Sequence, residues 1–342
     1  MRRLAAICAV ISALVWALAN DAQAEDYNLG VRRLLTEVAG TPVPIRLFYP
    51  TNAQAEATRF GPWELFVAKD AMPAAGPFPL IVISHGLSGN GWNHHLLARD
   101  LVEVGFVVAA TQHPDDLLRI GRPEVAVLRP LELSAGIDAV LNDAQLGPRV
   151  DATKIGAFGF SLGGFTALSA AGGLADHDRI RTHCAQAAND PEFCIGEEGG
   201  ARLPIWLRIR RMGYSIPKVD VSRDVIDGRI SAVVAAAPVG VPFQDMSRVQ
   251  MPVLLLRAGA DRALRFPYHA EHVRSLLPAG HSYQTLEGLH HYAFLSPFPA
   301  SIARDVGAPA EDPEGFDRKA FLEEINQVIV AFFKTNLMLK DP

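Results

Sequence analysis

The chain has 342 residues, of which 49% are hydrophobic and 20% charged, and its formal net charge is −5. This hydrophobic content can bury the core of one large globular domain or of two small ones. The charges form no basic stripe and no long run of one sign, so the composition excludes a nucleic-acid-binding surface and we predict no nucleic-acid partner.

The first 24 residues have the pattern of a cleavable signal peptide. Arg2 and Arg3 precede an apolar stretch over 4–18, and the run Ala22-Gln23-Ala24 has the small-x-small pattern of a cleavage site. The apolar stretch is short for a bilayer-spanning helix, and no later stretch is long and apolar enough to span a membrane. We therefore expect a mature chain over 25–342 that is periplasmic or secreted, with no membrane span; an uncleaved anchor is the alternative.

Removal of the signal peptide leaves two cysteines, Cys184 and Cys194. An even number of cysteines in an exported chain predicts a disulfide between them, and two free buried thiols are the alternative. Two cysteines separated by nine residues lack the second ligand pair of a structural metal site, so we predict no metal there.

The predicted elements alternate along most of the chain. Two strands are expected at 30–38 and 44–49, followed by a Pro/Ala-rich loop over 52–79. Continuous apolar runs, typical of parallel strands buried on both faces, come next at 80–83, 106–110, 155–160, 230–236 and 253–256, with a shorter strand at 282–286. Helical spacing occurs at 92–104, 130–146, from 161 onward, 269–277 and 316–333. This alternation predicts an α/β protein with a mostly parallel, doubly wound sheet.

One region interrupts the alternation between strands and helices. Residues 173–227 contain both mature cysteines and Trp206, and they show no regular period. Long insertions in compact domains are often functional, so we interpret this one as a lid-like insertion over the active face, closed by the disulfide and lining a pocket with Trp206. The alternatives are a solvated decoration and a Trp206 that only packs the insertion onto the core.

The run Gly159-Phe160-Ser161-Leu162-Gly163 lies between an apolar strand and an alanine-rich helix. A G-x-S-x-G run in that context is typical of a sharp turn that presents a nucleophilic serine, because the flanking glycines let the strand and the helix nearly touch. The sequence therefore predicts Ser161 as a nucleophile, and an ordinary glycine-rich connection is the alternative.

A serine nucleophile needs a base and a group that orients the base. Asp261 follows the strand at 253–256 and is the best candidate for the acid, with Asp245 as a weaker one. The base is expected just past the last short strand, at His290 or His291, of which only one can face the serine on an extended loop.

The oxyanion of acyl transfer needs backbone N–H donors. We expect one from Leu162, the residue after the nucleophile, and one from Leu87 in the turn that follows the strand at 80–83. His85 precedes Leu87 in this turn, and we expect it to support the loop by hydrogen bonding rather than to react.

These motifs occur in the order His85-Gly86-Leu87, Gly159-x-Ser161-x-Gly163, Asp261 and His291, and this order resembles the α/β-hydrolase superfamily over essentially the whole mature chain. Within it the chain is similar to exported proteins described as predicted dienelactone hydrolases, which are related to the platelet-activating factor acetylhydrolase group. The matching runs are 45–50, 84–89, 159–168 and 288–295. In that group the catalytic histidine is followed by an aromatic residue, a small or polar residue and then Phe-Leu, a pattern that selects His291.

The resemblance implies a hydrolase that cleaves carboxylic esters through a Ser161–His291–Asp261 triad and an acyl-enzyme, without metal or organic cofactor. Dienelactone hydrolases carry cysteine at the sharp turn, whereas this chain has serine, so we expect general ester hydrolysis rather than dienelactone turnover. The expected substrate is a small-molecule or lipid-like ester. One alternative is an amide or peptide substrate for the same machinery. Another is a catalytically inactive fold used for binding, which would lack a member of the triad.

Overall fold

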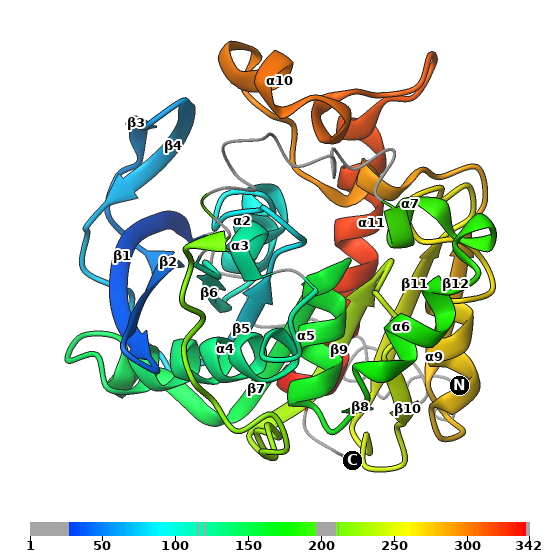
Figure 1. The fold of residues 1–342 in the computed structure, drawn as a ribbon. Helices are drawn as coiled ribbons and strands as arrows, with labels where there is room; N and C mark the ends of the chain where they lie inside the picture. The colour runs from blue at the N-terminus through cyan, green and yellow to red at the C-terminus, as the bar shows by residue number, and fades with distance from the viewer. Residues whose placement is uncertain (1–26, 115, 120, 196–209, 211, 340–342) are drawn as a thin grey trace, which may run out of the picture.

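The computed structural model describes residues 27–114, 116–119, 121–195, 210 and 212–339, so the predicted signal peptide and Trp206 lie outside the described residues. Ten strands form one sheet in the order β12-β11-β9-β7-β5-β6-β2-β1-β4-β3 (Figure 1). Their bounds are β1 (Asn28–Val38), β2 (Thr41–Thr51), β3 (Glu56–Phe60), β4 (Trp63–Lys69), β5 (Phe78–Ser84), β6 (Val107–Thr111), β7 (Val150–Phe160), β9 (Ile230–Ala236), β11 (Val253–Ala258) and β12 (Ser282–Leu286).

The half of the sheet from β6 to β12 is parallel, as predicted. β5 pairs with both β6 and β7, and the order continues through β9 and β11 to β12, each pair parallel. Every residue of β5 and β6 is buried, because helices cover both faces of these apolar strands. The chain leaves β5 toward β6 on one side and returns as β7 on the other. The carboxyl ends of β5 and β7 therefore flank the position where open α/β sheets bind ligands.

The other half of the sheet corrects one expectation. Residues 52–79 were expected to be mostly loop, but they contain the antiparallel hairpin of β3 and β4, turned at Gly61 with a φ of +62°. The hairpin extends the sheet beyond β1, which pairs antiparallel with β2 and parallel with β4. The two short strands were not predicted because proline and alanine in the flanking segments favour a loop and because the strands' side chains are largely solvent-exposed.

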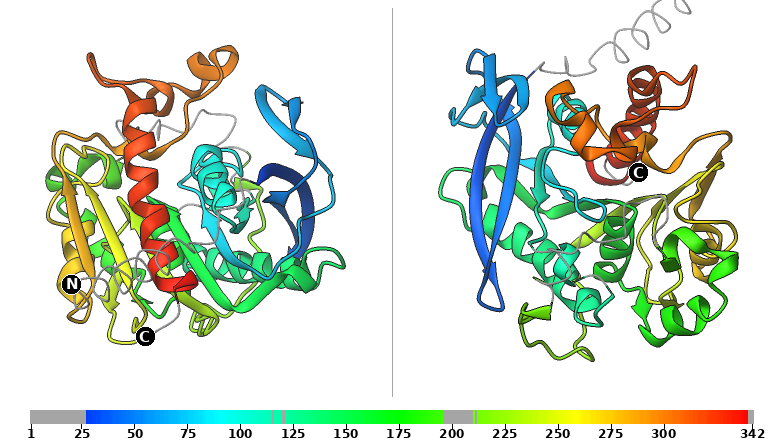
Figure 2. Two further views of the ribbon diagram at one scale, coloured as in Figure 1. Left: turned by 180° about the vertical axis from the view of Figure 1, so that it is seen from behind. Right: turned by 45° about the horizontal axis from the view of Figure 1, so that its top comes forward.

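Helices cover both faces of the sheet (Figures 1 and 2). One hydrophobic core lies under α4 (Val125–Leu141), α5 (Leu162–Ala170) and α9 (Ala270–Leu276), and the other lies under α2 (His95–Glu103) and α11 (Arg318–Phe333). The fold is therefore α/β, doubly wound and mostly parallel, consistent with an α/β-hydrolase-like arrangement. α4 begins five residues before the predicted start at Pro130, which lies inside the helix. The remaining described α-helices are α3 (Asp116–Arg119), α6 (Asp178–Cys184), α7 (Pro191–Ile195) and α10 (Ala300–Val306).

Residues 173–195 of the predicted insertion pack at the β11–β12 end of the molecule. Residues 212–227 lie instead beside α3 and α5, where the Arg119 Nε donates to the Tyr214 hydroxyl at 3.1 Å and the Asp227 N–H donates to the Ala170 carbonyl oxygen at 2.8 Å. α6 and α7 lie on the same face as α9, and β8 (Leu174–Ala175) pairs with β10 (Phe243–Asp245) in a separate two-stranded sheet. Cys184 and Cys194 form the predicted disulfide, with their Cα atoms 5.3 Å apart. A disulfide is compatible with an extracellular or periplasmic location. Across the described ranges, no helix combines the length and the apolar character needed to cross a membrane.

Candidate active site

Ser161 lies in a sharp turn between β7 and α5. Its φ of 56° and ψ of −118° are rare for a residue with a side chain, and such backbone strain costs on the order of 1–3 kcal/mol. The flanking glycines have no substitute: a Cβ on Gly159 would lie 2.1 Å from the Gly163 carbonyl oxygen, and a Cβ on Gly163 would lie 1.9 Å from the Ser84 carbonyl oxygen. The turn therefore needs glycine at both positions to bring β7, α5 and the end of β5 together.

Three side chains from distant parts of the sequence meet at the carboxyl edge of the sheet. The Ser161 Oγ lies 3.0 Å from the His291 Nε2, and the His291 Nδ1 lies 2.7 Å from the Asp261 Oδ2. Both distances are within hydrogen-bond range. Ser161 and His291 are 9% and 6% exposed, so this contact is largely screened from bulk water but not sealed.

The loops that carry Asp261 and His291 are tied to each other by backbone hydrogen bonds. The Gly259 N–H donates to the Leu286 carbonyl oxygen at 2.8 Å, and the Ala260 N–H donates to the Leu289 carbonyl oxygen at 2.9 Å. The second carboxylate oxygen of Asp261, Oδ1, accepts the Leu264 N–H at 2.8 Å. Since both oxygens of Asp261 have donors, the carboxylate is held in one orientation toward His291.

The two weaker sequence candidates lie elsewhere. The His290 Nε2 is 3.5 Å from the Asp312 Oδ1, and its ring packs edge-on against Phe316, away from Ser161. Asp245 is in β10 of the small sheet, where its carboxylate accepts hydrogen bonds from the Ser247 backbone and hydroxyl. Neither residue is in the group formed by Ser161, His291 and Asp261.

The two predicted oxyanion donors flank Ser161. Leu162 is the first residue of α5, where a backbone N–H has no acceptor within the helix. Leu87 follows β5 in a turn closed by the Gly89 N–H on the Gly86 carbonyl oxygen at 3.1 Å. A Cβ on Gly86 would lie 3.4 Å from the Ser161 Cβ, so the backbone of this turn passes directly beside Ser161.

His85 supports this turn through its ring. The His113 N–H donates to the His85 Nε2 at 3.0 Å, which leaves the proton on Nδ1, and Nδ1 lies 2.7 Å from the Gly86 carbonyl oxygen. Burial, with the positive charge of Arg129 acting in the same direction, lowers the pKa of His85 to about 3. The ring is therefore neutral at physiological pH.

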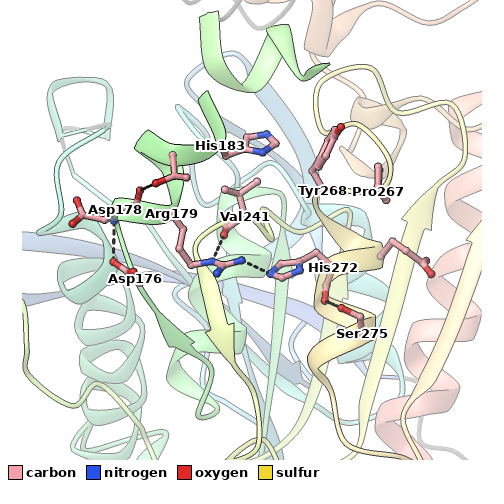
Figure 3. A pocket seen from close by; sticks show the side chains of 11 residues that line it. Asp176, Asp178, Arg179, His183, Val241, Pro267, Tyr268, His272 and Ser275 are labelled. Carbon is pink, nitrogen blue, oxygen red and sulfur yellow. Dashed lines mark hydrogen bonds between the residues drawn. The ribbon is translucent and has the colours of Figure 1, made fainter. Parts of the chain in front are cut away.

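A cavity of about 680 Å³ opens between α6 and α9 (Figure 3). The Arg179 guanidinium lies across it, with Nε donating to the Val241 carbonyl oxygen at 3.2 Å. Among the described residues that line this cavity there is no member of the Ser161, Asp261 and His291 group. The candidate active site is therefore identified by the contacts among Ser161, His291 and Asp261 and not by this cavity.

The disulfide-closed loop is joined to the core beside this cavity. Asp190 is fully buried, and its Oδ2 lies 2.8 Å from the His269 Nε2 and 2.9 Å from the His183 Nε2. Burial raises the pKa of Asp190, but the hydrogen bonds from His269 and His183 outweigh it and hold that pKa below its ordinary value. His269 follows the segment that carries Asp261, so the disulfide-closed loop over 184–194 is anchored next to that segment.

A second group of buried polar residues lies behind the turn that carries Leu87, and of its members only His85 was predicted to have a structural role. It contains Ser84, His85, His113, Arg119, Arg129 and Glu132, each at most 3% exposed, and we call it the α4 polar cluster. The only sequence signal for it is the charged pair Arg129 and Glu132 at the start of the predicted helix over 130–146. Within the described residues, no group of three or more His, Cys, Asp or Glu side chains is placed to hold a metal ion.

The protein is an α/β protein with a large mixed, mostly parallel sheet, and its fold is consistent with an α/β-hydrolase-like fold. Neither a scan against protein-family models nor a search of curated proteins finds a match for the chain. The assignment of a function therefore depends on the geometry of the site.

Proposed function

We propose that this protein is a serine hydrolase that cleaves carboxylic esters, with Ser161 as nucleophile, His291 as general base and Asp261 as the group that orients the base. The observation that carries the proposal is the pair of distances that join the three side chains, 3.0 Å from Ser161 to His291 and 2.7 Å from His291 to Asp261. This arrangement is the one that serine catalysis requires, and triads are recognised by geometry and roles rather than by sequence position.

In the first half of the reaction, the Ser161 Oγ attacks the ester carbonyl carbon and its proton passes to the His291 Nε2. The carbonyl oxygen becomes an oxyanion that accepts the N–H groups of Leu87 and Leu162. The Asp261 carboxylate accepts a hydrogen bond from the His291 Nδ1–H and stabilises the imidazolium. When the tetrahedral intermediate collapses, the bond to the alkoxy oxygen breaks, and His291 donates its proton to the departing alcohol.

In the second half, water attacks the acyl-enzyme carbonyl while its proton passes to the His291 Nε2. The oxyanion forms again at the same two donors and then collapses, which breaks the bond to the Ser161 Oγ. The carboxylic acid leaves, and the proton on His291 returns to Ser161. Each proton in this cycle is carried by one histidine, so the cycle as written uses no metal or organic cofactor.

We further propose that the substrate is a small-molecule or lipid-like ester, and that the enzyme works in the periplasm or outside the cell. Leu87, 39% exposed beside the nucleophile, gives the rim of the site an apolar side chain suited to an acyl or alkyl chain. The disulfide at Cys184 and Cys194 supports an oxidising compartment. The insertion over 173–227 is proposed to shape the access to Ser161, since Asp190 in its disulfide-closed loop is anchored to His269, near the segment that carries Asp261.

The proposal is tested by hydrolysis of p-nitrophenyl acetate by the mature protein and by Ser161→Ala. We expect turnover by the parent and none above background by the variant. Ser169→Ala is the matched control, because Ser169 is a buried serine of the same helix α5 and takes no part in the mechanism. Turnover by Ser161→Ala at the rate of the parent would refute the assignment. A parallel measurement with p-nitroanilide substrates separates ester from amide hydrolysis.

A further inference from the structure

The α4 polar cluster has no role in the proposed reaction, yet it contacts both segments that carry the oxyanion donors. Buried charged groups are costly unless they are paired and hydrogen-bonded. Here Arg129 projects from α4 into the space between the end of β5 and the start of α5, and Glu132 faces His113, which follows β6; both side chains are at most 1% exposed. We propose that Arg129, together with Glu132 and His113, is a positioning residue that fixes the two halves of the oxyanion hole relative to each other.

Arg129 joins the two segments directly. Its Nη2 donates to the carbonyl oxygen of His85 and, at 3.2 Å, to the Ser84 Oγ at the end of β5. Its Nε donates to the Thr166 Oγ1 in α5 at 3.0 Å. The Thr166 hydroxyl in turn donates to the Leu162 carbonyl oxygen at 2.9 Å. One planar guanidinium thus sets the distance between the strand end that leads to Leu87 and the helix turn that begins with Leu162.

A second path fixes the orientation of the peptide that contains the Leu87 N–H. The carbonyl of Gly86 belongs to the same planar peptide group as the Leu87 N–H, and in a trans peptide the two bonds point in opposite directions. The His85 Nδ1–H holds the Gly86 carbonyl oxygen, so the Leu87 N–H points away from His85. His85 is fixed by the His113 N–H on its Nε2.

Glu132 completes this path. Its Oε2 lies 2.7 Å from the His113 Nδ1, and its Oε1 accepts Arg119 Nη1 at 2.5 Å. The His113 Nε2 lies 2.8 Å from the Ser84 Oγ, so Ser84, His113 and Glu132 repeat the order of a serine triad. All three are at most 3% exposed, so no substrate reaches Ser84, and the group serves to hold the loop.

This inference rests on the proposed function, and it is tested on the mature protein with Arg129→Lys. Lysine keeps the positive charge but replaces the planar fork with a single ammonium, so it cannot hold Ser84, His85 and Thr166 at once. Arg229→Lys is the matched control, because Arg229 also makes several hydrogen bonds, to Asp227 and Asp138, at the amino end of β9 away from Ser161.

The readouts are kcat and KM for p-nitrophenyl acetate per active site, titrated with a fluorophosphonate, and the affinity for a trifluoromethyl ketone, which mimics the tetrahedral intermediate. For Arg129→Lys we expect kcat per titrated site to fall at least tenfold, toward the 10²–10³-fold loss typical of a missing oxyanion donor. KM should change less than threefold, and the inhibitor affinity should fall in parallel with kcat/KM. A residue with only a structural role would lower the titrated fraction and leave kcat per site unchanged.

The inference is overturned if Arg129→Lys keeps kcat per titrated site within twofold of the parent. If Arg129→Lys fails to fold, Thr166→Val removes the acceptor on α5 with little change of shape; the inference then requires at least a threefold loss of kcat per site and is overturned by an unchanged value. A parent protein that the fluorophosphonate does not label overturns the proposed function and this inference together. A labelled, active parent with an unaffected Arg129→Lys variant overturns this inference alone.

Discussion

Gly163→Ala is the substitution whose effect follows most directly from the packing of the site. The added Cβ would lie 1.9 Å from the Ser84 carbonyl oxygen and 2.7 Å from the His85 carbonyl oxygen, both backbone atoms that cannot rotate away. Because such contacts do not occur below 3.0 Å, the end of β5 must move away from α5 by about 1 Å. Overpacking of this kind costs about 1–3 kcal/mol of unfolding free energy.

The same displacement separates the backbone donors of Leu87 and Leu162, since they follow the two segments that are pushed apart. A misplacement of about 1 Å at a reacting centre costs on the order of 10²-fold in rate. We therefore expect Gly163→Ala to lose about 10²-fold in kcat per titrated site and about 1–3 kcal/mol of unfolding free energy in urea.

Gly228→Ala provides the control for this substitution. A Cβ at Gly228 meets nothing within 4 Å, so its unfolding free energy should stay the same or rise by about 0.4–1 kcal/mol, with unchanged kcat. If Gly163→Ala and Gly228→Ala behave alike in both assays, the close approach of β5 and α5 does not determine the geometry of the site.

Three other substitutions test separate contacts. Asp261→Asn removes the carboxylate on the His291 Nδ1 and should lower kcat for p-nitrophenyl acetate by on the order of 10³–10⁴-fold, whereas a loss below tenfold would contradict its role. Replacing Cys184 and Cys194 together with serine opens the closed loop and should lower the unfolding free energy by about 2–3 kcal/mol in urea; equal stability would show that the disulfide contributes nothing. Folding lowers the pKa of His85 from 6.5 to about 3, so the unfolded chain binds the proton first and stability is lost as pH falls below 6.5, by up to about 1.4 kcal/mol per pH unit. Urea unfolding at pH 7.5 and 5.5 should therefore show a smaller loss for His85→Asn than for the parent, and equal losses would contradict the lowered pKa.

The parallel half of the sheet was predictable because its strands are buried on both faces. The runs at 230–236 and 282–286 are β9 and β12 with the predicted bounds, and the strand before Ser161 ends where predicted, at Phe160. A short continuous apolar run indicates a buried strand when turn residues bound it and helical segments lie between such runs.

The hairpin of β3 and β4 could not be predicted in this way. Its burial pattern is mostly exposed or half-buried, so its residues carry only a weak alternation of polar and apolar side chains. The start of α4 was also not predicted: the helix was expected from Pro130, a residue type favoured in the first turn, whereas it begins at Val125 and contains Pro130 in its interior.

The candidate site was predictable in part. A glycine-flanked serine after a buried strand, a carboxylate after another strand and a histidine past the last strand indicate positions along one sheet edge. The α4 polar cluster was not predictable, because Arg129 meets the carbonyl oxygen of His85 across 44 residues of sequence and Thr166 across 37. Nothing local to α4 indicates which buried segment its charged side chains contact.

The most direct test of the central claim is peptide mapping by mass spectrometry after reaction of the mature protein with a fluorophosphonate. Our account predicts one covalent adduct, on Ser161, and a large loss of labelling in His291→Gln, because the hydroxyl then lacks its base. It also predicts no adduct on Ser84, which is fully buried although it contacts His113 and, through it, Glu132. An unlabelled protein, or labelling of Ser161 at an unchanged rate in His291→Gln, would contradict the assignment of this site.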